Sequence, residues 1–173
     1  DEKILGRLAA LAWLDGKTAE LQNLEKEVLS FDKKPALFYL EMGELLSSRR
    51  RFPEAELRLK QAIALRPNLP EPLISLAMLS LQMGREAEAR TLLEKGLKAD
   101  PFHVQTANSL KVLRHLDKYE TLKTEHYIFK FDALQDKALV TYMAFFMEEN
   151  FAQLNARFRF SPKEPILVEV FSN

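Results

Sequence analysis

The sequence contains no cysteine, few glycines and no excess of either charge. Without cysteine, the chain has no disulfide, no thiolate ligand for zinc and no cysteine nucleophile. Lys and Arg total 25, as do Asp and Glu, so the basic surplus that binding to nucleic acid requires is missing. No apolar run approaches the roughly 18 residues of a membrane span. The sequence therefore predicts a soluble chain that neither binds nucleic acid nor spans a membrane.

The sequence opens at Asp1 without a methionine and shows no signal peptide. We therefore expect a piece of a longer protein, whose compartment the sequence leaves open. All five glycines lie before residue 97, whereas phenylalanines crowd the end of the chain. This shift in composition predicts two architectures that join near residue 120.

A pattern of constant length repeats in the first part of the chain. Pro67 and Pro101 lie 34 residues apart, and apolar side chains precede each proline at helical spacing. Small side chains recur in the same register at Gly43 and Ala77, and at Ala55 and Ala89. Two antiparallel helices approach closely only where one side chain is nearly absent, and proline does not continue a helix. The pattern therefore predicts successive hairpins of packed helices.

This pattern resembles the tetratricopeptide repeat (TPR). The positions of that repeat are occupied by Tyr39, Met42, Gly43, Leu46, Ala55, Leu59, Ala62 and Pro67, and then by Leu73, Leu76, Ala77, Ala89, Leu93, Gly96 and Pro101. The flanking units depart from it, as terminal units that face water do, with Leu21 and Lys111 at small positions. The resemblance implies a mainly α fold, a TPR-like α-α superhelix (solenoid) of about three and a half repeats over residues 1–120.

Residues 121–173 follow a different pattern. Apolar and polar residues alternate over 126–132, which predicts a strand, and 166–171 predict a second strand. Between them, we expect Asp136 to cap a long helix over about 137–158. This order predicts a small β-α-β unit with parallel strands. Because two strands alone make a marginal sheet, the unit is expected to be the start of a truncated domain.

The tail also resembles the opening of the peptidase-MA-like (gluzincin) metallopeptidase domain, which follows TPRs in large bacterial proteins. The resemblance rests on Thr-Glu-His-Tyr at 124–127 and on Val-Glu-Val-Phe at 168–171. That family binds zinc through H-E-x-x-H on a helix. The motif is absent here, where the three histidines are His103, His115 and His126. We therefore expect no enzyme activity, metal or cofactor in this chain.

The resemblance to the TPR places a concave groove on the first helix of each hairpin. The positions that line it hold Leu37, Leu40, Glu44, Ser47 and Ser48, then Glu71, Ile74, Met78, Leu81 and Gln82, and finally Gln105, Asn108, Val112, His115 and Leu116. Few of them are Lys, Arg or Asn, so a clamp for a terminal carboxylate is not expected. The apolar members, Leu37, Leu40, Ile74, Met78, Leu81 and Val112, would form a stripe. Either an amphipathic helix covers this stripe, from a partner or from the chain's own tail, or packing between repeats buries it.

These patterns favour a non-catalytic module that binds a protein or peptide in the groove of a solenoid. Two other interpretations stand beside it. The chain is the N-terminal part of a larger zinc metallopeptidase-like protein, which H-E-x-x-H downstream of residue 173 would indicate, or it is a self-assembling scaffold. The arginines at 49–51 form either an anion-binding patch or a solvated turn. The sequence specifies neither the partner nor the oligomeric state.

Overall fold

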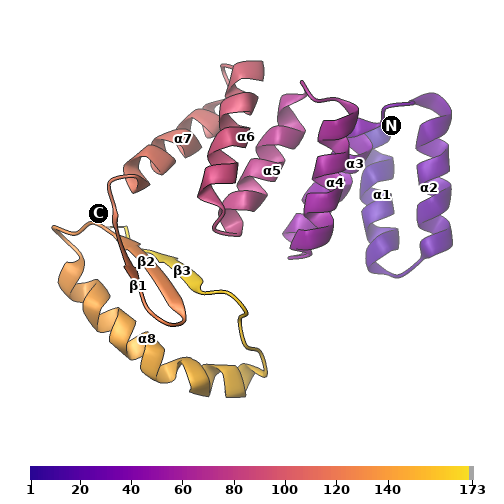
Figure 1. Ribbon diagram of the computed structural model, residues 1–173. Helices are drawn as coiled ribbons and strands as arrows, with labels where there is room; N and C mark the ends of the chain where they lie inside the picture. The colour runs from indigo at the N-terminus through magenta and orange to yellow at the C-terminus, as the bar shows by residue number, and fades with distance from the viewer. Residues whose placement is uncertain (172–173) are drawn as a thin grey trace. The chain divides into compact units, whose positions relative to one another are not determined.

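The computed structural model describes residues 1–171 and forms two compact units that meet between Leu110 and Lys111 (Figure 1). The sequence pattern places this boundary at residue 120, after the end of the last solenoid helix at Leu116. Helices make up most of the chain, and a small sheet follows them. The mainly α fold with a solenoid and a small α/β unit is therefore confirmed.

The first unit is built from helical hairpins that stack in chain order (Figure 1). Its helices are α1 (Glu2–Leu14), α2 (Thr18–Phe31), α3 (Ala36–Ser48), α4 (Phe52–Leu65), α5 (Pro70–Gln82) and α6 (Glu86–Ala99), followed by α7 (Val104–Leu116), which crosses into the second unit. The hairpin pairs are α1 with α2, α3 with α4 and α5 with α6. Contacts of α1 with α3 and of α4 with α5 join successive hairpins.

Small side chains lie where these helices contact one another. Ala55 and Ala89 are fully buried. A Cβ added to Gly43 would lie 2.7 Å from Cγ of Leu59 and 3.2 Å from the carbonyl oxygen of Ala55. Only glycine therefore lets α3 and α4 pack at this distance. The small residues that recur in the sequence mark the contacts that hold the solenoid together.

The second unit is a three-stranded sheet with a long helix across one face. Its strands are β1 (Glu120–Lys123), β2 (Tyr127–Phe131) and β3 (Ile166–Glu169), and the helix is α8 (Lys137–Phe158). β2 and β3 are parallel, as predicted for the β-α-β unit, whereas β1 pairs antiparallel with β2. The strand β1 is not predicted from the sequence, whose pattern indicates only two strands. β1 escaped prediction because Leu122 is its one apolar residue, too few for an alternating pattern.

The core of the second unit lies between β2 and α8. It consists of Tyr127, Phe129, Phe131, Val140, Ala144 and Phe151. The helix begins directly after Asp136, as expected, but the Asp136 side chain accepts no capping hydrogen bond from the helix. Among residues 1–171, no helix is both long and apolar enough to cross a membrane.

Candidate functional site

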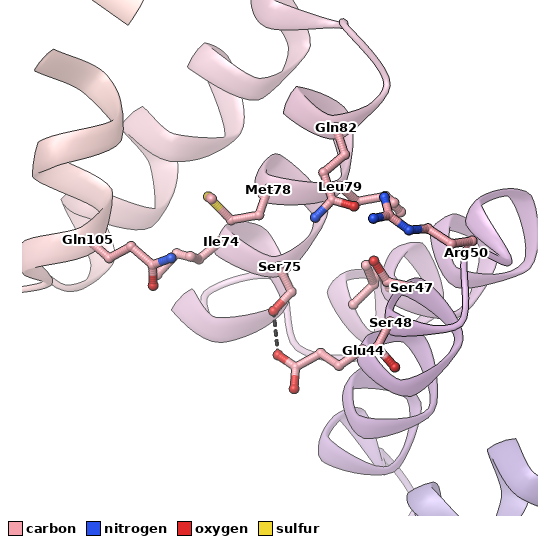
Figure 2. Close-up of a pocket in the computed structure, with 11 residues that line it drawn as sticks. Glu44, Ser47, Ser48, Arg50, Ile74, Ser75, Met78, Leu79, Gln82 and Gln105 are labelled. Carbon is pink, nitrogen blue, oxygen red and sulfur yellow. Dashed lines mark hydrogen bonds between the residues drawn. The ribbon is translucent and has the colours of Figure 1, made fainter. Parts of the chain in front are cut away.

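A pocket of about 430 Å³ opens on the first unit, between α3 and α5 (Figure 2). The first helices of two successive hairpins supply most of its walls, and the turn after α3, one residue of α4 and the start of α7 supply the rest. Its lining residues are Glu44, Ser47, Ser48, Arg50, Leu59, Ile74, Ser75, Met78, Leu79, Gln82 and Gln105. The pocket therefore lies along the row of first helices, where the sequence predicts the groove.

The base of the pocket is apolar and closely packed. Leu59 and Leu79 are each 1% exposed, and Ile74 is 7% exposed. Ile74 packs on α6, where a Cβ added to Gly96 would come within 3.0 Å of Ile74 Cγ1. These side chains belong to the solenoid core, so a ligand would meet only the small part of their surface that reaches the pocket.

The rim of the pocket is polar. Ser75 Oγ donates a hydrogen bond to Glu44 Oε1 at 2.6 Å, which joins α5 to α3 (Figure 2). Ser48 Oγ donates to the carbonyl oxygen of Leu45 at 2.7 Å. The remaining polar groups on the rim are those of Ser47, Arg50, Gln82 and Gln105. The rim thus offers hydroxyl, amide, guanidinium and carboxylate groups to a ligand.

Met78 connects the pocket to the last helix of the first unit. Its thioether sulfur lies 3.8 Å from Ser109 Oγ of α7, a long contact of hydrogen-bond type. The Met78 side chain is half-buried, and it points toward Gln105 of α7 in Figure 2. A flexible, polarisable side chain at this place can adapt to ligands of different shape.

The structure brings four of the nine predicted groove residues into this pocket: Glu44, Ile74, Met78 and Gln105. The other five lie elsewhere. Leu40 is 3% exposed, Leu37 and Leu81 are half-buried, and Asn108 is exposed on α7. Val112 is 47% exposed and belongs to the second unit.

The predicted apolar stripe does not form a continuous exposed surface, because Leu40 and Ile74 are buried. Packing between neighbouring helices covers them, which is the alternative that the sequence left open. The repeat pattern does not predict Arg50, Leu59, Ser75 or Leu79 at the groove. Arg50 does have a signal in the sequence, because it stands where the other two hairpins have Gly16 and Gly84.

The three histidines lie in separate places. His103 Nδ1 lies 2.8 Å from Thr106 Oγ1 at the start of α7, and the His115 ring contacts Tyr119. His126 is held by Glu148 of α8, which accepts hydrogen bonds from its backbone N–H at 2.8 Å and from its Nδ1 at 2.7 Å. In the part of the chain that the structure describes, no three His, Asp or Glu side chains gather to hold a metal ion.

The carboxylate of Glu148 is the most strongly perturbed group of this second unit. A hydrogen bond from the Thr124 hydroxyl and the hydrogen bonds from His126 lower the pKa of Glu148 from 4.5 to about 2. The ring of His126 also stacks on Phe151, with the ring centroids 3.6 Å apart. Glu148 therefore attaches α8 to the turn between β1 and β2.

Comparison with known proteins agrees with this architecture. The family model described as tetratricopeptide repeat matches residues 46–111. The first TPR domain of Spaghetti (RPAP3), solved with an HSP90 peptide, superposes with a TM-score of 0.51 at 16% identity, over 66% of this chain and 90% of that chain. For the Arabidopsis OM64 TPR domain the TM-score is 0.51 at 15% identity, over 66% and 94%.

A bacterial chaperone has a similar fold. The type III secretion translocator chaperone SycD of Yersinia enterocolitica superposes with a TM-score of 0.52 at 16% identity, over 68% of this chain and 94% of that chain. At such low identity, these similarities establish the fold and not the ligand. No curated protein matches the sequence significantly. The family model supports tetratricopeptide repeats over residues 46–111, and the similar structures show a TPR-like solenoid fold for the helical part of this chain.

Proposed function

We propose that the first unit is a non-catalytic protein-interaction module and that its pocket binds an extended segment of a partner protein. The observation that carries this proposal is the pocket between α3 and α5, whose volume of about 430 Å³ is within the range of ligand sites. Repeat arrays use such concave surfaces for binding, and the similar TPR domain of Spaghetti was solved with a peptide.

The chemistry of the rim favours an extended segment over a helix. An extended peptide leaves its backbone N–H and C=O groups unpaired, whereas a helix satisfies most of its own. The hydroxyls of Ser47 and Ser48 and the amides of Gln82 and Gln105 can pair with such groups. The amphipathic helix expected from the sequence required a broad apolar stripe, and burial of Leu40 and Ile74 reduces that stripe. An extended peptide is therefore the better ligand.

The test is to fill the pocket without disturbing the fold. Ser48→Trp would place an indole in the pocket, and we expect it to abolish binding of peptides selected from a phage-displayed random library against the full chain. Ser30→Trp is the matched control, because Ser30 is also exposed near a helix end and its hydroxyl also bonds the carbonyl three residues earlier. Equal binding by the two variants would contradict the proposal.

Two expectations from the sequence stay predictions. The resemblance of the tail to the opening of a gluzincin domain is testable by searching the reading frame after residue 173 for H-E-x-x-H. Self-assembly of the chain is testable by light scattering over a concentration series, where a constant monomer mass would exclude it. Neither expectation changes the peptide-binding role proposed for the first unit.

A further inference from the structure

One position of the repeat has the same unusual backbone conformation in all three hairpins. It is the turn between the two helices of each hairpin, occupied by Gly16, Arg50 and Gly84, which are spaced 34 residues apart. Their φ angles are 71°, 60° and 72°. All three residues are therefore in the left-handed region, which glycine enters freely and other residues rarely adopt.

The hydrogen bonds of the three turns are also the same. The N–H of the left-handed residue donates to the carbonyl three residues earlier, at 3.1 Å for Gly16, 2.9 Å for Arg50 and 3.0 Å for Gly84. The next N–H donates to the carbonyl five residues earlier, at 2.8, 3.0 and 2.8 Å. This is the Schellman arrangement, in which the left-handed position is usually glycine. The geometry of the turn therefore calls for glycine in every hairpin, and one hairpin has arginine instead.

Contacts within the protein do not explain the arginine. Among the residues that the structure describes, no acidic side chain forms an ion pair with Arg50, and the contact recorded for its guanidinium is with the Phe52 ring, 5.8 Å from the ring centroid. The next residue is different, because Arg51 pairs with Glu54 at 2.6 Å and lies over Trp13. A strained residue without a compensating structural role points to function.

Arg50 is placed where it can meet a ligand. It is the single cation among the described residues that line the pocket, and Figure 2 shows its guanidinium reaching across the opening toward Gln82. The carboxylate of the pocket, Glu44, is engaged by Ser75 on another part of the rim. The positive charge at the opening is therefore available to an anion brought by the partner. A guanidinium binds a carboxylate with two parallel hydrogen bonds.

We propose that Arg50 determines the specificity of the pocket by binding an Asp or Glu side chain within an extended partner segment. This inference rests on the proposed function, because it names the chemistry of the segment that the pocket takes. It also accounts for the arginine, since a residue with a short or absent side chain would fit the turn better but would offer no charge at the opening.

The test compares the full chain with three variants in selection from a phage-displayed library of random peptides fused at their C-termini. Fusion removes the free terminal carboxylate, so acidic side chains are the source of any preference. Arg50→Gln keeps the backbone strain and removes the charge, whereas Arg50→Gly removes both. Arg49→Gln is the control, because Arg49 is exposed next to Arg50 but does not line the pocket.

We expect the wild-type chain and Arg49→Gln to select peptides rich in Asp and Glu, and Arg50→Gln to lose that preference. A selected acidic peptide should bind Arg50→Gln at least tenfold more weakly, a loss of about 1.4 kcal/mol. Arg50→Gly should lose binding in the same way, and its midpoint of urea unfolding should rise because the strain is gone. Weaker binding together with higher stability is a result that a structural role for Arg50 would not produce.

The outcomes that would overturn the inference are distinct from those that would overturn the proposed function. If Ser48→Trp abolishes binding but the selected peptides show no acidic preference, or bind Arg50→Gln equally well, the pocket is a binding site and the role of Arg50 is wrong. If Ser48→Trp has no effect on the selected peptides, the pocket is not the binding site, and the inference fails with the proposed function. A lower urea midpoint for Arg50→Gly would contradict the strain argument directly.

Discussion

Gly6 allows a close approach of two helix backbones, and the distance supports a quantitative prediction. An ideal Cβ at Gly6 would lie 2.3 Å from the carbonyl oxygen of Phe38 and 3.1 Å from Cβ of Glu41, both in α3. Carbon atoms normally keep about 3.5 Å or more from their neighbours, so α1 and α3 would have to separate by about 1 Å in Gly6→Ala. The obstacle is backbone, which no side-chain rotation can relieve.

The size of the effect follows from two opposing terms. Alanine in a helix interior is favoured over glycine by about 1 kcal/mol. Forced separation of packed helices typically costs about 1–3 kcal/mol. Here it would also lengthen the 2.7 Å hydrogen bond from Arg7 Nε to Glu41 Oε2, which joins the same two helices. The gain in helix propensity offsets part of the cost of separation, so we expect Gly6→Ala to lower the free energy of unfolding by about 1 kcal/mol.

Gly96→Ala is the matched control. Its added Cβ would meet Ile74 Cγ1 at 3.0 Å, a side-chain atom that can move, so the gain in helix propensity should offset the contact and leave stability almost unchanged. Urea unfolding followed by the fluorescence of Trp13, the single tryptophan, reports on α1 directly. If Gly6→Ala is as stable as the wild type, or if Gly96→Ala loses as much as Gly6→Ala, the close-approach argument is wrong.

Two further predictions concern acid. Because hydrogen bonds from Thr124 and His126 hold the pKa of Glu148 near 2, its stabilisation of the second unit is present above the ordinary value of 4.5 and is lost as pH falls toward 2. Glu148→Gln should therefore unfold more easily than the wild type at pH 6, with a difference that disappears near pH 2 in near-ultraviolet circular dichroism. In the first unit, Arg85 donates two hydrogen bonds to Glu56, at 3.1 and 2.8 Å, and lowers the pKa of Glu56 to about 2. Glu56→Gln should lower the free energy of unfolding by about 1 kcal/mol at neutral pH, a value reduced for solvent screening. Near pH 2, the urea unfolding curve followed by Trp13 fluorescence should be the same for Glu56→Gln and the wild type. If the difference is as large at pH 2 as at neutral pH, the ion pair is not its source.

The fold was largely predictable because its main contacts involve residue size in a fixed register. Gly43, Ala55 and Ala89 are buried at helix contacts, and that requirement is visible in the sequence as small residues 34 positions apart. The strand β1 was not predictable in the same way. Its pairing with β2 depends on backbone hydrogen bonds, which leave no pattern in the polar sequence of Glu120–Lys123.

The sequence indicates which helices line the candidate site but not how deeply each of its side chains is buried. Repeat register places Glu44, Met78 and Gln105 on the first helices, and in the structure all three line one pocket. Register says nothing about depth, however, so it did not separate Met78, which is half-buried, from Leu40, which is 3% exposed. Depth is set by how closely the next helix packs, and that distance depends on side chains from several hairpins at once.

The same register also governs polar contacts between the first two hairpins. Glu41 accepts a hydrogen bond from Arg7, 34 residues earlier, and Asp32 pairs with Arg66, 34 residues later. Between the second and third hairpins, Ser75 donates to Glu44 and Arg85 donates to Glu56. These bonds and the buried small residues hold the walls of the pocket in place before any ligand arrives. In such a scaffold, a change on the rim alters binding without altering the fold. Arg50 occupies the position that Gly16 and Gly84 hold in the other hairpins, and it lines the pocket, so substitutions at Arg50 test ligand binding separately from the fold.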